Sequence, residues 1–408
     1  MTTPRRADVV VVGAGPAGAA TGILLAEHGL DVVVLERATL PRPKICGEYL
    51  SPEAVRLLDR LGVLKTLDAA GPAALAGMRI TAPDGTTVVA RYRALHTWQP
   101  YRQYAMGVAR ETLDGALAER LRGLPLDFRE DARVTDVLVD GAQVIGVRGA
   151  DRGQAPLEIR ARVVVGADGR HSVVAQRLGC REPHPLRRLA LVTYVRGVPE
   201  CRELGEIFVD PPDYAILNPL APERVNLSVV VPLDHATPWS GRLEDFLLAR
   251  VRQLPHLARR LVGAERVAPV QALGPLAHRV RPPRQGGVVL VGDAAGFYDP
   301  FSGEGIFSAL RGAELAVETI VGALRGGDVS VRALAGYQRA RHAAFAGKDR
   351  VTRALQAVIR RRWLANRVCR TLARRPGALD GLLGVLGDYV PPGALPTLLR
   401  GAASRVSR

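Results

Sequence analysis

A glycine-rich hexapeptide near the start of the chain has residue types and a spacing that predict phosphate binding. Residues 13–18 read GAGPAG and follow the valine-rich segment 8–12, which is typical of a buried parallel strand. In this spacing Gly13 makes a tight turn, Gly15 lets a pyrophosphate approach the backbone, and Gly18 lets the following helix pack closely. Because N–H groups at a helix N-terminus bind anions, the hexapeptide predicts a dinucleotide site.

An acidic residue completes this β-α-β unit. A helix is predicted over 19–28 and a second buried strand over 31–35, and Glu36 follows that strand directly. Glu36 is placed to accept the two hydroxyls of an adenosine ribose, whereas it disfavours a 2′-phosphate. The nucleotide is therefore predicted to be FAD or NAD, not NADP. The predicted cofactor contacts of this unit also include Pro16, Ala17 and Arg37.

Three further segments combine glycine with acidic side chains. The strand predicted over 163–165 leads into GADG, the strand predicted over 288–291 leads into GDAAG, and PFSGEGI follows at 300–306. A carboxylate on a rigid strand end suits ribitol hydroxyls, and backbone amides of a glycine-rich turn suit the polar edge of a flavin ring. These segments contain Asp168, Gly169, Gly292, Asp293, Pro300, Gly303, Gly305 and Ile306.

The N-terminal glycine hexapeptide, GADG and GDAAG occur in this order along the chain. With these three motifs, residues 7–330 resemble the FAD-dependent oxidoreductases of the para-hydroxybenzoate-hydroxylase type. That superfamily includes aromatic-ring monooxygenases, flavin halogenases and the geranylgeranyl reductase family. The resemblance implies FAD as the cofactor. It also implies NADH or NADPH as a transient electron donor, since the chain holds a single dinucleotide fingerprint. Arg110 matches the family's arginine near the FAD pyrophosphate, and Asp293 matches the aspartate near the ribitol or pyrophosphate. The alternatives are a surface arginine for Arg110 and a plain turn residue for Asp168.

The sequence around Cys46 indicates a branch of the superfamily. Residues 44–48 (KICGE) and the segment 299–306 resemble the geranylgeranyl reductase family most, and Lys44 and Cys46 are further expected cofactor contacts. Prenyl reductases carry a YxWxFP-like stretch. The nearest match here, 214–219 (YAILNP), has Ile and Asn in place of Trp and Phe. The tryptophans at 98, 239 and 363 lie outside the WxWxIP context of halogenases, which argues against halogenation.

Two reactions compete for this chain. The first is hydroxylation of a phenolic, quinone-like or polyketide substrate in secondary metabolism. This monooxygenase hypothesis is slightly favoured. The second is reduction of isoprenoid double bonds. A flavin-binding redox sensor is the non-enzymatic alternative. Cys46 and Tyr214 are the catalytic candidates, and the alternatives are a small buried thiol and a core tyrosine.

The predicted fold is α/β with a Rossmann-like FAD-binding domain, a parallel sheet and a β-meander. That domain is assigned to residues 1–75, 100–180 and 265–330. An inserted antiparallel substrate-binding sheet is assigned to 76–99 and 181–264, and a helical C-terminal region to 331–408.

Charge is the remaining signal. The net charge is +16, and nine arginines lie between 348 and 375 with apolar residues at helical spacing. This predicts a basic amphipathic helix or helix pair, which either packs as a solvated face or contacts anionic lipid. We expect a cytoplasmic protein with peripheral contact at the inner membrane face, a hydrophobic small-molecule substrate and no nucleic-acid partner. The four cysteines lack the spacing of a metal site or a disulfide framework. The oligomeric state stays open.

Overall fold

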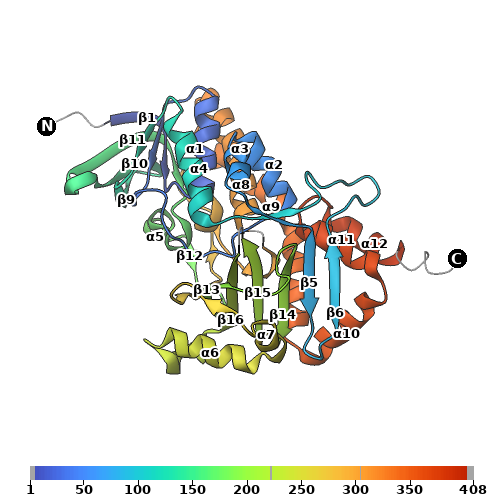
Figure 1. The fold of residues 1–408 in the computed structure, drawn as a ribbon. Helices are drawn as coiled ribbons and strands as arrows, with labels where there is room; N and C mark the ends of the chain where they lie inside the picture. Colours follow the sequence, from blue (N-terminus) through green and yellow to red (C-terminus); the bar gives the residue numbers. More distant parts are fainter. Residues whose placement is uncertain (1–4, 221–222, 304, 402–408) are drawn as a thin grey trace.

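The computed structural model describes residues 5–220, 223–303 and 305–401, and its strands form two main sheets at opposite ends of the molecule (Figure 1). The first sheet has the order β8-β2-β1-β11-β10-β9, and β20 pairs with β11. Its strands are β1 (Arg5–Val12), β2 (Val32–Leu35), β8 (Asp127–Arg129), β9 (Arg133–Asp140), β10 (Gln143–Ala150), β11 (Pro156–Gly166) and β20 (Val288–Leu290).

Parallel pairing joins β1 to β2 and β11, β2 to β8, and β11 to β20. The predicted meander is β9-β10-β11, whose pairs are antiparallel. The third meander strand and the strand expected over 163–165 are one continuous strand, β11, because its start pairs with β10 and its end with β20.

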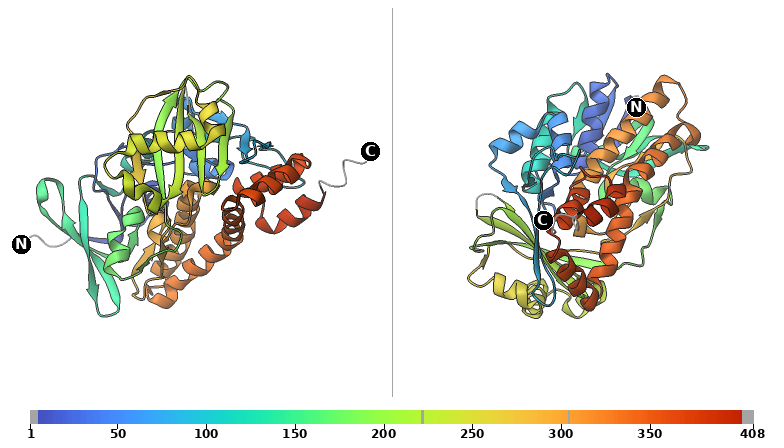
Figure 2. Two further views of the ribbon diagram at one scale, coloured as in Figure 1. Left: turned by 90° about the horizontal axis from the view of Figure 1, so that it is seen from below. Right: turned by 90° about the vertical axis from the view of Figure 1, so that its right-hand side faces the viewer.

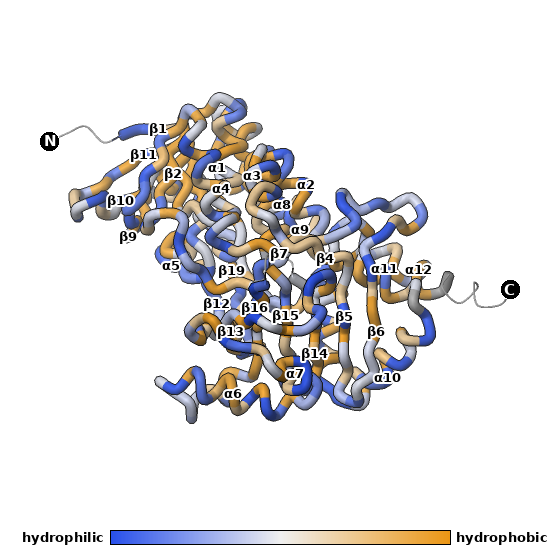
Figure 3. Tube along the Cα trace, in the orientation of Figure 1, coloured by the Kyte–Doolittle hydropathy of each residue, from blue (hydrophilic) through white to orange (hydrophobic). Residues whose placement is uncertain are grey.

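Helices cover one face of this sheet. They are α1 (Pro16–Glu27), α2 (Pro52–Arg60), α3 (Leu64–Ala69), α4 (Arg110–Arg122) and α8 (Gly305–Arg325), and they share one apolar core with β1 and β2. The meander and α5 (Val173–Arg177) form a second core on the other face. Figure 3 shows β2 and the valine run at the end of β1 as hydrophobic, as expected where both faces of a parallel sheet are buried.

The second sheet has the order β17-β13-β16-β15-β14-β5-β6, and β18 pairs with β13. Its strands are β5 (Gly77–Thr81), β6 (Thr87–Arg91), β13 (Arg188–Arg196), β14 (Leu204–Asp210), β15 (Asp213–Leu220), β16 (Arg224–Pro232), β17 (Glu265–Arg266) and β18 (Gln271–Leu273). The segment 76–99, assigned to this sheet, forms the hairpin β5–β6, which pairs with β14 and so joins the strands of 188–232. One pair, β14–β5, is parallel in an otherwise antiparallel sheet.

Two features of this region differ from the sequence prediction. Residues 265–273 were assigned to the FAD-binding domain, but β17 and β18 pair with β13 of the second sheet. Helices α6 (Leu243–Gln253) and α7 (Pro255–Arg260) were not expected in a segment read as sheet. They cover one face of the second sheet through Phe246, Leu247 and Leu257 (Figure 1).

The remaining strands are short. β3 (Tyr49–Leu50), β4 (Ala73–Leu75) and β7 (Ala105–Gly107) form a small sheet between the two large ones, and β12 (Arg181–Glu182) pairs with β19 (Arg279–Val280). The C-terminal region is helical in its described part, with α9 (Val331–Ile359), α10 (Arg362–Ala373), α11 (Pro376–Leu386) and α12 (Leu395–Gly401). Figure 2 shows these helices running from α8 to the second sheet, where α10 and α11 contact β6. Among the described residues, no helix is both long and apolar enough to cross a membrane.

Candidate FAD site and its junction with the second sheet

The glycine hexapeptide forms the turn between β1 and α1. Gly13 has φ +97°, and a Cβ on Gly18 would lie 1.8 Å from the Gly13 carbonyl oxygen, so both positions exclude a side chain. Among the residues that the structure describes, no atom would lie within 4 Å of a Cβ on Gly15. Open space at Gly15, directly before the N-terminus of α1, is what an approaching pyrophosphate needs.

Glu36 lies at the end of β2, in the predicted position. Its buried carboxylate accepts hydrogen bonds from the backbone amides of Ala14 (2.9 Å) and Ala38 (3.2 Å), and Arg42 lies 3.5 Å away. The carboxylate expected to bind the ribose is thereby held against the turn expected to bind the phosphates. Arg37, the next residue, is exposed.

The other motifs meet this turn. A Cβ on Gly13 would lie 2.8 Å from the Cα of Asp168, and a Cβ on Gly292 would lie 2.8 Å from the Cβ of Ala17. GADG, GDAAG and the first turn of α1 therefore meet at the carboxyl ends of β1, β11 and β20, a region that we term the FAD groove. This location agrees with the general rule for ligand sites in open α/β sheets.

Asp168 has a structural task as well. One of its oxygens accepts from the backbone amide of Val173 at 2.6 Å, which fixes the start of α5, and burial raises the pKa of its carboxyl. Its other oxygen, Oδ1, is buried without a hydrogen-bond partner among the described residues. The same holds for Nε and Nη1 of Arg170 and for Nδ1 of His278, whose Nε2 lies 2.8 Å from the Asp293 carbonyl oxygen. A ligand rich in hydroxyl and phosphate oxygens would satisfy these atoms.

Arg110 is not the surface residue considered as the alternative. It is the first residue of α4, it is buried, and its guanidinium forms an ion pair at 2.9 Å with Asp114, which is fully buried. Burial lowers the pKa of Arg110, but Cys46 and Asp114 raise it by more, so the guanidinium stays charged. A buried charge of this kind beside the groove suits a pyrophosphate.

Lys44 supplies a second cation. Its Nζ lies 3.7 Å from the point that a Cβ on Gly169 would occupy. Burial lowers the pKa of Lys44, Arg110 lowers it further, and Asp293 opposes both. Lys44, Arg110, Asp168 and Asp293 are thus neighbours in space although they come from four segments of the chain. The residues present therefore fit FAD.

The segment 299–306 closes the far end of the groove. The Asp299 carboxylate accepts from the backbone amide of Phe301 at 3.0 Å and caps the short 3-10 helix Pro300–Ser302. Gly303 has φ +67°, and a Cβ there would lie 2.8 Å from Cδ1 of Tyr49. Gly305 begins α8, Ile306 is buried in the first core, and Glu304 lies outside the described residues.

Tyr214 was predicted to be catalytic, and the structure places it differently. Its side chain is fully buried, and its hydroxyl donates to Oδ1 of Asp299 at 2.7 Å. Gln356 of α9 donates to the same oxygen at 2.7 Å, and the Arg188 guanidinium lies 5.4 Å from the Tyr214 ring centre. Tyr214 therefore holds the 299–303 loop from behind and has no surface that a substrate touches in this structure.

Cys46 lies, partly exposed, between the groove and the second sheet. Its Sγ accepts from the backbone amide of Glu48 at 3.3 Å. The neighbouring Ile45 packs against the apolar cluster of Phe301 and Tyr214, and Tyr49 packs on Gly303. The segment Lys44–Tyr49 thus runs along the 299–303 loop, as expected for a flavin-adjacent segment.

Sequence reasoning missed most of the polar cluster that surrounds this segment. Glu48 is buried and accepts from the Tyr194 hydroxyl (2.9 Å), the Asn226 side-chain amide (3.0 Å) and the Arg110 backbone amide (2.9 Å). Asn218 donates to the carbonyl oxygens of residues 47 and 48. One feature of the sequence pointed to this cluster, because Asn218 occupies the position at which prenyl reductases have Phe. Burial and then Glu48 raise the pKa of Tyr194.

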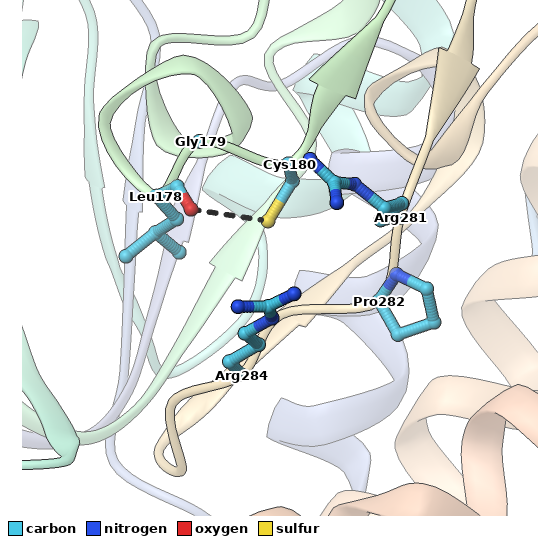
Figure 4. Close-up of a pocket in the computed structure, with 6 residues that line it drawn as sticks. All are labelled: Leu178, Gly179, Cys180, Arg281, Pro282 and Arg284. Carbon is cyan, nitrogen blue, oxygen red and sulfur yellow. Dashed lines mark hydrogen bonds between the residues drawn. The ribbon is translucent and has the colours of Figure 1, made fainter.

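Two cavities lie outside the groove. A cavity of about 440 Å³ lies at the end of the β15–β16 hairpin, and Arg224 in its wall stacks 3.6 Å from the ring centre of Tyr194. A smaller one of about 130 Å³ lies beside Cys180, Arg281 and Arg284 (Figure 4). In Figure 4 the Cys180 thiol points toward the Leu178 carbonyl oxygen, 3.6 Å away. Burial raises the pKa of Cys180, so this thiol is not an activated nucleophile.

The fold and the groove define an FAD-dependent enzyme. A sequence profile described as "FAD binding domain" matches residues 6–350, and the chain belongs to that family. Menaquinone reductase of Mycolicibacterium smegmatis is 30% identical over 77% of this chain and 76% of its own length. Digeranylgeranylglycerophospholipid reductase of Methanosarcina acetivorans is 28% identical over 76% of this chain and 74% of its own length. Conditioned medium factor receptor 1 of Dictyostelium discoideum is 29% identical over 76% of this chain, which spans 62% of that protein.

Solved structures have the same fold. The flavin-dependent brominase Bmp2 superimposes with a TM-score of 0.82 at 21% identity, over 98% of this chain and 99% of that one. A geranylgeranyl bacteriochlorophyll reductase-like protein from Thermoplasma acidophilum gives a TM-score of 0.73 at 19% identity, over 99% and 97%. The expected superfamily is confirmed, and the proteins similar to this chain include a geranylgeranyl-type reductase as well as a halogenase.

Proposed function

We propose that this protein reduces a carbon–carbon double bond of a hydrophobic, isoprenoid-like molecule. The observation that supports this best is the place of the Lys44–Tyr49 segment, which lies between the FAD groove and the second sheet. Reduction of an alkene needs a hydride at one carbon and a proton at the other. When bound, FAD supplies the hydride after reduction by NADH or NADPH.

The chain's own residues provide the other requirements. Cys46 and Tyr194 are proton-bearing groups at the junction, and Tyr194 is hydrogen-bonded to the buried Glu48. Proton delivery from such a group is ordinary general acid catalysis. The groove cations Lys44 and Arg110 bind the anionic part of the cofactor, and the 299–303 loop holds its ring edge. The relatives that act on menaquinone and on digeranylgeranylglycerophospholipid support an isoprenoid substrate.

Hydroxylation of a phenolic or quinone-like ring is the second candidate, and one observation favours it. The stretch 214–219 lacks the Trp and Phe of prenyl reductases, and Asn218 uses its amide to hold the backbone instead of lining an apolar channel. A reaction of this kind needs oxygen as well as a reduced cofactor.

An anaerobic assay separates the two. Purified FAD-loaded protein is incubated without oxygen with NADH or NADPH and with menaquinone. The mass of the product is then measured by mass spectrometry. We expect a gain of two hydrogens without oxygen that remains after the quinone ring is reoxidised in air, because reduction of the ring to the quinol adds the same mass. A product that forms only in air and gains one oxygen atom would establish the hydroxylase instead. Bleaching of the flavin band on addition of NADH or NADPH tests the donor directly.

We also infer that the protein works at a membrane surface, since an isoprenoid substrate partitions into lipid. In the structure the predicted basic segment 348–375 is the end of α9 plus α10. Lys348 does not belong to a surface patch, because it is buried and ion-paired with Asp388. Apolar residues of this segment pack inward on the second sheet. Trp363, which is 66% exposed, lies at the corner formed by Arg360, Arg361 and Arg362.

A further inference from the structure

The carboxylate of Glu48 joins three parts of the molecule. It is 2% exposed, and hydrogen-bond donors reach it from the first residue of α4, from β13 and from β16. The donor from α4 is the backbone amide of Arg110, whose side chain belongs to the FAD groove. The other two donors, the Tyr194 hydroxyl and the Asn226 side-chain amide, belong to the second sheet. One side chain therefore connects the groove to the second sheet.

A row of polar side chains holds the backbone of the same segment. Tyr194, Asn226 and Asn218 lie opposite one another in the register of β13, β16 and β15. Asn226 donates to the carbonyl oxygen of Cys46 at 2.9 Å, and Asn218 donates to those of residues 47 and 48 at 3.0 and 2.9 Å. The Ser228 hydroxyl donates to Oδ1 of Asn226 at 2.8 Å, which fixes the orientation of that amide.

The backbone of Glu48 shows that this arrangement is imposed. Its φ is +54°, in the left-handed region that disfavours residues other than glycine. Such a conformation persists only where the surroundings over-determine it, and it is often found at functional sites. Here both the side chain and the backbone of Glu48 are held from the second sheet.

We propose that Glu48 is a positioning residue, which fixes the Lys44–Tyr49 segment over the FAD groove and makes FAD binding depend on Tyr194, Asn226 and Asn218 of the second sheet. Lys44 beside Gly169 and Cys46 beside Arg110 are the parts of the segment that reach the groove. The inference rests on the FAD site alone and holds whether the reaction is a reduction or a hydroxylation.

The hydrogen-bond pattern predicts which substitutions matter. Glu48 is surrounded by donors, so the amide N–H of a Glu48→Gln variant would face another donor. Asn226 cannot turn its amide to compensate without losing both its bond from Ser228 and its bond to Cys46. Tyr194→Phe removes one donor and keeps the ring under Arg224.

The test measures FAD itself. The dissociation constant of FAD by flavin fluorescence, the midpoint potential of the bound flavin and the thermal midpoint are measured for each variant. We expect FAD to bind about tenfold more weakly to Glu48→Gln, the usual scale for a lost charged hydrogen bond, and the flavin potential to shift. Tyr194→Phe should give a smaller loss of the same sign. None of these readouts requires turnover, so failure of the proposed reaction would leave them unaffected.

Matched controls are available nearby. Glu53→Gln changes a carboxylate in the next helix that pairs with Arg56, and Tyr101→Phe removes an exposed hydroxyl that donates to Asp59. Both should leave FAD affinity and potential unchanged.

Two results would overturn the proposal. One is unchanged FAD affinity and potential in both Glu48→Gln and Tyr194→Phe with a lowered thermal midpoint, which would make Glu48 a purely structural residue. The second result concerns the case in which the Glu48→Gln variant does not fold. Tyr194→Phe then decides, and wild-type FAD affinity and potential in that variant would refute the dependence on the second sheet.

Discussion

The FAD groove is formed mainly by backbone groups, whereas its junction with the second sheet is formed by side chains. The groove consists mainly of backbone, in which glycines at 13, 15 and 18 create the turn and the space for a phosphate. The junction consists of side chains, in which Glu48 meets Tyr194, Asn226 and the amide of Arg110. A groove of backbone amides serves any dinucleotide, whereas a cluster of side chains can differ from one protein of the same fold to the next. This contrast explains why the shared fold identifies the cofactor but not the substrate.

The Arg110–Asp114 pair is the main exception to a backbone-built groove, and breaking it should have the largest effect. Asp114→Ala leaves a buried guanidinium unpaired, which costs about 3–5 kcal/mol of the free energy of unfolding. FAD should offset part of this loss, because its pyrophosphate is an anion beside Arg110. Urea unfolding with and without FAD measures both values.

Glu158→Ala is the control for that variant, since it removes an exposed partner of Arg160 and should cost less than about 1 kcal/mol. An equally small loss in Asp114→Ala would show that the groove does not depend on this pair.

Two glycine variants test whether the groove really is shaped by backbone and empty space. Gly15→Val should destabilise the flavin-free protein less than Gly18→Ala does, because no atom of the described residues lies within 4 Å of the Gly15 Cβ position. The same valine occupies the space of the pyrophosphate, so FAD affinity should fall at least about a hundredfold, equivalent to ~2.7 kcal/mol.

Gly18→Ala should behave in the opposite way. Its Cβ would collide with the Gly13 carbonyl oxygen, so the flavin-free protein itself should lose about 1–3 kcal/mol of stability. Thermal melts and flavin fluorescence distinguish the two variants. A stable Gly18→Ala protein, or a Gly15→Val protein that binds FAD normally, contradicts the proposed groove.

A pH dependence should distinguish the loop at residue 299 from the groove. Burial raises the pKa of Asp299 above its ordinary value of 3.8. A carboxyl with a raised pKa in the folded state contributes stability that is complete below the unfolded pKa and is lost as the pH rises through the folded pKa. The wild type should therefore lose stability relative to Asp299→Asn as the pH rises from below 3.8 toward neutrality. Urea unfolding of both flavin-free proteins across this range gives the difference, and a difference that is independent of pH would be the contrary result.

The smallest effect is expected at the exposed corner of α9 and α10. Each arginine near an anionic membrane contributes at most about 1 kcal/mol, and salt screens the attraction. Replacing Arg360, Arg361 and Arg362 by Gln should weaken sedimentation with anionic liposomes several-fold at low salt. Arg362 also pairs with Asp210, so Arg360 and Arg361 are expected to account for most of the loss. Arg133→Gln, at an exposed strand of the first sheet, serves as the control. Equal recovery of the wild type with neutral and anionic liposomes would reduce the patch to a solvated face.

Much of the groove was predictable from sequence because its parts are local. The strand, turn and helix of residues 5–27 and the carboxylate at Glu36 follow one another along the chain, and each has its own signal. Tyr214 was predicted to be catalytic, because the alternation of residues along its strand does not show which face of the second sheet lies against Asp299. In the segment 348–375, which was expected at a membrane, Lys348 turns inward to Asp388, and a helical arginine-rich stretch does not show which cation does so.

By itself, the sequence determined the fold class and the family and predicted the FAD contacts, since glycine spacing and strand-end carboxylates act through the local backbone at the ends of strands. Only the tertiary structure decided how Glu48, Tyr194, Asn218 and Asn226 are used. These residues are far apart in the chain and come together because β13, β16 and β15 pair in one register beneath the Lys44–Tyr49 segment. A side chain's hydrogen-bond partners depend on which strands pair and which face they present. That is a property of the packed molecule and not of any local stretch of sequence.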